Sequence, residues 1–268
     1  MSSANNDASP ASAQPSLLRL AGIGKNFGPV RALSGIDLDI PAGQVTAIVG
    51  DNGAGKTTLI KTISGIWQPD HGSLMWEGKQ VHLHSPKDAV GLGIATVYQD
   101  LALCDNLDIV QNMFLGTELT RHWQLDEVAM EISAKTTLAD LSVTTVRSIR
   151  QPVGSLSGGQ RQAVAVAKAV MRQAKLVVMD EPTAALGVTQ TKVVLDLIRR
   201  LATSGIAVIV ISHNLTDVMA IADRITVLYL GRLAAAGPAS AYDTAAIVDL
   251  MTTGSTQRLV AAPQSETS

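Results

Sequence analysis

The segment Gly50–Thr58 reads GDNGAGKTT and follows directly on the apolar run Val45–Val49. Its spacing is G-x-x-x-x-G-K-T, and an apolar helical pattern begins at Leu59 immediately after it. A buried strand before such a loop and a helix after it form the setting in which backbone N–H groups cradle a phosphate chain. A plain glycine turn is the alternative, and the flanking strand and helix count against it. The segment therefore predicts a nucleotide-binding loop.

Two side chains of this loop have specific expected roles. Lys56 can reach the β- and γ-phosphates of a nucleotide, and the hydroxyl of Thr57 can ligate Mg²⁺. The candidate nucleotide-binding residues of the loop are Gly50, Asp51, Asn52, Gly53, Ala54, Gly55, Lys56, Thr57 and Thr58.

Composition restricts the class of protein around this loop. At 268 residues the chain can bury a large core, and with 46% hydrophobic but only 3% aromatic residues that core must be aliphatic. The net charge of −2 offers no basic surface for nucleic acid. The single cysteine, Cys104, cannot form an internal disulfide; we expect a buried, inert thiol in a reducing compartment.

We expect no membrane span, because no window approaches the roughly 18 apolar residues that a span requires. Residues 1–16 have neither a basic start nor an apolar stretch, so they do not resemble a signal peptide. We expect them, and residues 254–268, to be disordered tails. These observations predict a cytosolic protein whose contact with a membrane is made through partners.

Short apolar runs and helical patterns alternate along much of the chain. The expected strands are at 17–23, 33–40, 45–49, 73–77, 80–84, 94–98, 176–179, 207–211 and 225–230. The expected helices are at 56–66, 158–172, 189–202 and 214–222. Such alternation implies an α/β fold with a mostly parallel sheet. Between about 101 and 151 the pattern is helical and irregular without a strong strand, which predicts a helical insertion into that core.

Two adjacent carboxylates, Asp180 and Glu181, end the apolar run that begins at Leu176. Successive strand side chains point to opposite faces, so a buried strand cannot keep both acids in its core. The carboxyl end of a strand is where sites form in open α/β sheets. There Asp180 can hold the Mg²⁺ shell while Glu181 polarises an attacking water. The alternative is a pair of solvated loop acids.

The segment Leu156–Gln160 reads LSGGQ, in which Ser157 is a good helix N-cap followed by exposed glycine amides. LSGGQ between a phosphate loop and an Asp-Glu strand end resembles the ATP-binding subunits of ABC (ATP-binding cassette) transporters. The resemblance runs from about Leu17 to Met251. The segments around Gln99 (VYQDLAL) and after Glu181 (EPTAALGV) are similar to ATPases of carbohydrate importers for ribose, xylose or fructose.

The resemblance implies a P-loop NTPase fold with an N-terminal antiparallel β subdomain. It implies a cassette at 17–253 with a helical insertion at about 101–172. It also implies ATP and Mg²⁺ as cofactors and a head-to-tail dimer, with ATP between one chain's phosphate loop and the LSGGQ of the other. The other implied partners are membrane permease subunits and, indirectly, an extracytoplasmic sugar-binding protein, with no nucleic acid. The chain would then sit peripherally on the cytoplasmic face of the inner membrane.

The family motifs assign further roles to individual residues. Glu181, His213 and Gln99 match the catalytic positions: His213 the switch histidine beside the γ-phosphate, and Gln99 the glutamine that senses Mg²⁺ and links to the membrane subunits. The implied metal ligands are Thr57, Gln99 and Asp180. Across the dimer, ATP would be contacted by Ser157, Gly158, Gly159 and Gln160.

Other residues have weaker indications. Phe27 matches the aromatic that stacks on adenine, although a packing role is nearly as reasonable an interpretation. We expect surface or structural roles for His71, His82, His84 and His122. His82 and His84 would share a strand face, but no cysteine or acidic cluster completes a metal site.

One departure from the family is Gly187, which stands where members usually carry an aspartate that couples the two sites and caps the next helix. We expect Thr189 to provide the cap instead.

Two alternative functions are a soluble ABC ATPase acting on nucleic acid or the ribosome, and an inactive regulatory cassette. The low net charge disfavours the first, and the presence of Lys56 and Glu181 disfavours the second.

Overall fold

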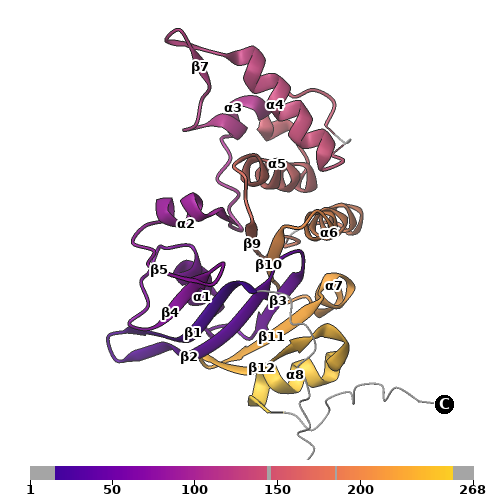
Figure 1. Cartoon of the computed structure of the whole chain (residues 1–268). Coiled ribbons are helices and arrows are strands. Elements are labelled where there is room, and N and C mark those ends of the chain that lie inside the picture. Colours follow the sequence, from indigo (N-terminus) through magenta and orange to yellow (C-terminus); the bar gives the residue numbers. More distant parts are fainter. Residues whose placement is uncertain (1–15, 144–145, 185, 256–268) are drawn as a thin grey trace, which may run out of the picture.

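The computed structural model describes residues 16–143, 146–184 and 186–255 (Figure 1). Nearly all of the two expected tails, 1–16 and 254–268, lies outside these ranges. Within the described part of the chain, no helix is both long and apolar enough to cross a membrane.

The central sheet has the strand order β12-β11-β3-β10-β9-β6. Its parallel strands are β3 (Val45–Gly50), β6 (Ile94–Val97), β9 (Leu176–Asp180), β10 (Ala207–Ile211) and β11 (Arg224–Tyr229). The predicted parallel sheet is thus confirmed. The antiparallel edge strand β12 (Arg232–Pro238) was not predicted, because its alanine-rich sequence gives little alternation between apolar and polar residues.

Helices cover both faces of this sheet (Figure 1). Along β9, Val177 and Met179 pack into a core with α5 (Gly158–Met171) and α6 (Val188–Thr203). Leu176 and Val178 point to the opposite core, formed with α1 (Lys56–Ile63) and the N-terminal strands. The remaining helices of the core are α2 (Pro86–Leu92), α7 (Leu215–Ile221) and α8 (Thr244–Thr253), of which α2 and α8 were not predicted.

A second sheet is antiparallel and has the order β2-β1-β4-β5. Its strands are β1 (Ser16–Phe27), β2 (Val30–Pro41), β4 (His71–Trp76) and β5 (Lys79–Val81). The predicted N-terminal antiparallel subdomain is therefore confirmed. The expected strand at 80–84 is wrong in its extent: β5 ends at Val81, so His82 and His84 lie outside it, on the surface. No cluster of metal-ligating side chains occurs among the described residues.

The middle of the chain forms a mostly helical layer around α3 (Ile109–Phe114), α4 (Glu127–Asp140) and the 3-10 turn Val153–Ser155. A two-stranded hairpin, β7 (Thr120–Arg121) and β8 (Gln124–Leu125), departs from the expected absence of strands. It was not predicted because each strand has only two residues. Cys104, at the start of this region, is half-buried rather than buried.

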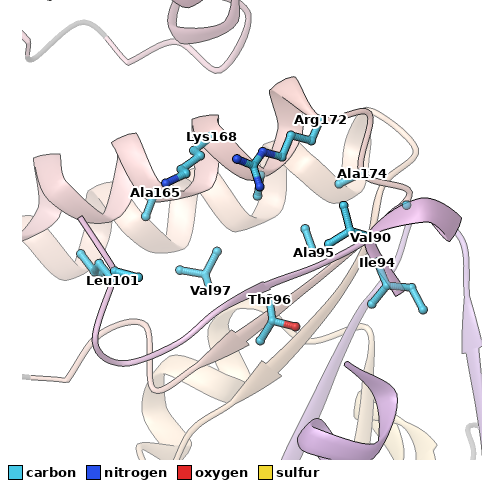
Figure 2. Close-up of a pocket in the computed structure, with 13 residues that line it drawn as sticks. Val90, Ile94, Ala95, Thr96, Val97, Leu101, Ala165, Lys168, Arg172 and Ala174 are labelled. Carbon is cyan, nitrogen blue, oxygen red and sulfur yellow. The ribbon is translucent and has the colours of Figure 1, made fainter. Parts of the chain in front are cut away.

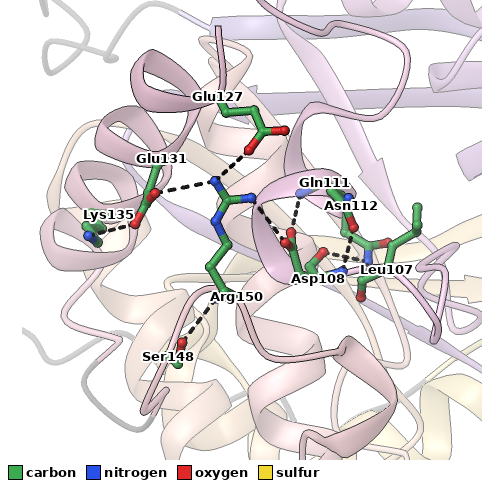
Figure 3. A network of polar contacts seen from close by, with 9 residues as sticks. All are labelled: Leu107, Asp108, Gln111, Asn112, Glu127, Glu131, Lys135, Ser148 and Arg150. Atoms are coloured by element: carbon green, nitrogen blue, oxygen red, sulfur yellow. Dashed lines mark hydrogen bonds and ion pairs between the residues drawn. The ribbon is translucent and has the colours of Figure 1, made fainter. Parts of the chain in front are cut away.

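Arg150 connects this helical layer to the segment that leads into α5 (Figure 3). Its guanidinium donates to Asp108 at 3.3 Å, to Glu127 at 3.2 Å and to Glu131 at 3.4 Å. Asp108 also caps α3, since its side chain accepts a hydrogen bond from the Gln111 amide. Because Arg150 is bound to both α3 and α4, the chain enters α5 from a fixed position.

Candidate functional site

The phosphate loop joins β3 to α1 as the sequence predicted. Gly55 is the N-cap of α1 and has φ +105°. A Cβ at this position would lie 2.8 Å from the Ala32 carbonyl oxygen, so only glycine lets the loop pass this close to β2. The helix therefore begins with its amides at the mouth of the loop, which suits an anion.

Lys56 lies inside this loop. Its Nζ donates to the carbonyl oxygens of Gly50 at 2.6 Å and of Asp51 at 2.9 Å. Burial lowers the pKa of Lys56, and the negative charges of Glu181, Asp51 and Asp180 oppose this. The loop carbonyl oxygens thus hold the ammonium group, and the charges of the two acids at the end of β9 act on it.

Asp180 and Glu181 lie where β9 leaves the sheet. Asp180 is in register with Ile211 of β10, and the Glu181 amide donates to the Ile211 carbonyl oxygen at 2.9 Å. Burial, and next the neighbouring Glu181, raise the pKa of Asp180, while Lys56 and Lys61 act against this. Glu181 has φ +50°, a conformation that is uncommon outside glycine and is seen at functional sites.

His213 follows β10 and faces Glu181. Its Nδ1 lies 2.8 Å from Glu181 Oε2, while most of the imidazole remains open to solvent. The two side chains come from neighbouring parallel strands whose carboxyl ends meet at the same edge of the sheet. A carboxylate positioned by a histidine in this way can act on a water molecule.

These residues line one pocket of about 470 Å³. It brings together most of the predicted nucleotide and catalytic residues: Asn52, Gly53, Ala54, Gly55, Lys56, Thr57, Thr58, Gln99, Asp180, Glu181 and His213. The start of β2 also lines this pocket, with Val30, Arg31 and Ala32. The sequence did not predict these residues because no motif marks the turn between β1 and β2.

Three predicted nucleotide-binding residues do not line this pocket. Gly50 and Asp51 instead accept the hydrogen bonds of Lys56 described above. Phe27 packs edge to face against Trp67 with ring centroids 4.6 Å apart, and it is 40% exposed. Its contact with adenine stays a prediction.

The LSGGQ segment begins α5. Ser157 is the N-cap, as predicted: its Oγ accepts from the Gln160 amide at 3.4 Å, and its own amide donates to Gln160 Oε1 at 2.9 Å. Ser157, Gly158, Gly159 and Gln160 are absent from the lining of the phosphate-loop pocket. Gly158 lines a neighbouring cleft of about 390 Å³ with Gln99 and Glu181.

The expected cap by Thr189 is wrong. Helix α6 starts at Val188 with Gly187 as its N-cap, and no side chain caps it. Thr189 is the second residue of the helix, so it lies beyond the N-cap position. The loop before α6 is held by a hydrogen bond to α7 instead of by a capping side chain: Thr183 Oγ1 donates to Asp217 Oδ2 at 2.7 Å.

Comparisons with known proteins agree with this geometry. Residues 33–184 match the family model described as ABC transporter. The chain is 48% identical over 217 residues to the xylose/arabinose import ATP-binding protein XylG of Sulfolobus acidocaldarius, covering 81% of this chain and 86% of that protein. It is 46% identical to the fructose import ATP-binding protein FrcA of Rhizobium meliloti, covering 82% and 87%.

Solved structures show the same fold. A nucleotide-free ATP-binding cassette from an ABC transporter superposes with a TM-score of 0.73 at 28% identity, covering 83% of this chain and 91% of that one. The ADP conformation of the cassette MJ1267 superposes with a TM-score of 0.76 at 27% identity, covering 89% and 95%.

Proposed function

This chain belongs to the ABC transporter ATP-binding family, and on that basis we propose that it is the ATP-hydrolysing subunit of a sugar importer. The observation that carries the proposal is the single pocket in which the phosphate loop, Gln99, Asp180, Glu181 and His213 meet. The names of its relatives, a xylose/arabinose and a fructose import ATP-binding protein, support a sugar as the transported solute.

In this proposal the loop amides and Lys56 hold the β- and γ-phosphates of ATP. Glu181, positioned by His213, accepts a proton from the attacking water. We infer that the His213 imidazole donates to the γ-phosphate. Gln99 enters the same pocket from the end of β6 and orients the water.

The oxygen donors of this pocket fit Mg²⁺. Thr57 offers a hydroxyl and Asp180 a half-buried carboxylate, with the Gln99 amide oxygen on the same lining. Burial beside Glu181 disfavours the ionised form of Asp180, so a cation held there would relieve an unfavourable charge. Bound Mg²⁺ would neutralise charge on the phosphate oxygens.

We infer a dimer because the two phosphate-binding elements of one chain line different cavities. Ser157–Gln160 are absent from the phosphate-loop pocket, whereas a second copy placed head to tail would bring its own LSGGQ to that ATP. The resulting pair has two composite sites. The remaining proposed partners are membrane permease subunits and an extracytoplasmic sugar-binding protein, with this chain peripheral on the cytoplasmic face of the inner membrane.

The alternative functions have less support. A net charge of −2 gives no electrostatic footprint for nucleic acid. An inactive regulatory cassette would not need the Glu181–His213 contact of 2.8 Å beside an intact phosphate loop.

Size-exclusion chromatography with light scattering tests the proposal on the Glu181→Gln variant, which should bind ATP without hydrolysing it. We expect a monomer without nucleotide and a dimer with Mg-ATP. The same mass under both conditions would contradict ATP-driven self-association.

A further inference from the structure

Asp217 is the only charged side chain among the buried residues in the described part of the chain, with 9% exposure. It lies in the first turn of α7, and its carboxylate accepts the hydrogen bond from Thr183 Oγ1 at 2.7 Å. Burying a carboxylate is costly, and a single hydrogen bond offsets only part of that cost. Neither residue lines the phosphate-loop pocket, although both lie close in sequence to residues that do.

Thr183 restrains the loop that follows Glu181. It stands two residues after Glu181, and the Ala184 amide donates to the Glu181 carbonyl oxygen at 3.1 Å. The φ of +50° at Glu181 is strained for a residue other than glycine, and such a conformation persists only where the surrounding structure holds it. The hydrogen bond from Thr183 to α7 provides a restraint of this kind.

Asp217 restrains the segment that carries His213. The imidazole of His213 is 73% exposed, so packing contributes little to its position. Its backbone is held instead: Ser212 Oγ accepts from the Asn214 amide at 3.0 Å, and Asn214 Oδ1 accepts from the Asp217 amide at 3.4 Å. The carboxylate of Asp217 then joins this segment to the loop after Glu181.

The two segments are thus connected on both sides of the Glu181–His213 contact. On one side the Glu181 amide donates to the Ile211 carbonyl oxygen at 2.9 Å, and on the other Thr183 donates to Asp217. The backbone hydrogen bond alone would let the segments turn about it, whereas two connections fix their relative orientation. Displacing a catalytic group by about 1 Å can lower a rate by roughly a hundredfold.

We propose that the Thr183–Asp217 hydrogen bond positions Glu181 against His213 for the hydrolysis of ATP. The inference rests on the proposed function. Thr183 and Asp217 are positioning residues, because they act through the catalytic pair. Loss of the hydrogen bond should therefore lower kcat, while the binding of ATP, which depends on the phosphate loop, is retained. A purely structural role would lower thermal stability and leave kcat unchanged.

The test uses the full chain co-expressed with the permease of the same transporter, with kcat and KM for ATP measured well below each variant's melting temperature. Thr183→Val removes the donor and keeps the side-chain shape. We expect kcat to fall roughly ten- to a hundredfold, with KM within about twofold of wild type. Thr183→Ser keeps the hydroxyl and should keep kcat within about threefold. Thr189→Val makes the same change at an exposed position on α6 and should behave as wild type.

Asp217→Asn keeps an acceptor oxygen but removes the charge, so it should lower kcat less than Thr183→Val does. It decides the question if Thr183→Val does not fold. An unchanged kcat in the folded variant, or a loss in Thr183→Ser equal to that in Thr183→Val, would overturn the positioning role. A rise in KM that accounts for the whole loss of kcat/KM would also overturn it. A wild-type complex without ATPase activity would instead refute the proposed function.

Discussion

Replacing Gly55 by alanine tests whether the phosphate loop depends on its close approach to β2. The backbone at Gly55 has φ +105°, and an added Cβ would lie 2.8 Å from the Ala32 carbonyl oxygen and 3.1 Å from Leu33 Cδ2. The left-handed conformation costs an alanine about 1–2 kcal/mol. The forced displacement of β2 or of the start of α1 adds roughly the 1–3 kcal/mol of an overpacked site. Together we expect about 3 kcal/mol of destabilisation.

For a chain of this size, that loss corresponds to a fall in melting temperature of roughly 6–12 °C. Thermal unfolding followed by circular dichroism measures it, and ATP titration of the same variant should show weakened binding. Gly78→Ala is the matched control, because Gly78 has φ +77° but open space around its Cβ, away from the loop. Its melting temperature should fall by the backbone contribution alone, and ATP binding should be unchanged. Equal melting temperatures for the two variants would refute the close-contact argument.

Two further predictions concern single side chains. Glu181→Gln should lower ATP turnover by roughly 10²-fold or more, as expected for losing a positioned base, while ATP affinity is retained; near-normal turnover would remove Glu181 from its assigned role. Lys168→Met should stabilise the isolated chain by about 0.5 kcal/mol, or roughly 1–2 °C, after allowance for solvent screening of a half-buried charge. Because the pKa of Lys168 is lowered on folding, the wild type is least stable relative to Lys168→Met at pH values below the folded-state pKa of Lys168. This difference in stability disappears as the pH rises toward the ordinary pKa of lysine, so melting temperatures measured across a pH series test it.

The parts of the fold that could be predicted are those whose cause is local in the sequence. The phosphate loop, the strand ending at Asp180 and the cap at Ser157 each depend on residues within one short segment. Parallel strands place their carboxyl ends at one edge, so the meeting of Glu181 and His213 also follows from the strand pattern.

The parts that could not be predicted depend on contacts between distant segments. The pocket lined by Ile94 and Val97 of β6 and by Lys168 of α5 (Figure 2) needs two elements that are far apart in the chain, and Lys168 alone has the pattern of an ordinary surface lysine. Arg150 contacts Asp108, 42 residues away, and no motif signals that pairing. The expected cap at Thr189 failed because a helix start is uncertain by one or two residues when no capping side chain marks it.

We propose that each ATP site is built from two copies of this chain. Two differently tagged copies, one with Ser157→Arg and the other with Lys56→Ala, are co-expressed with the permease and purified through both tags. In this mixed pair, the phosphate loop of the Ser157→Arg copy faces the unchanged LSGGQ of the other copy, so this site is intact. The other composite site carries both substitutions. We expect the mixed pair to keep about half of the wild-type ATPase activity, provided by that intact site, whereas each variant paired with itself is inactive. Failure to recover a doubly tagged complex, or a mixed complex as inactive as the two variants, would contradict it.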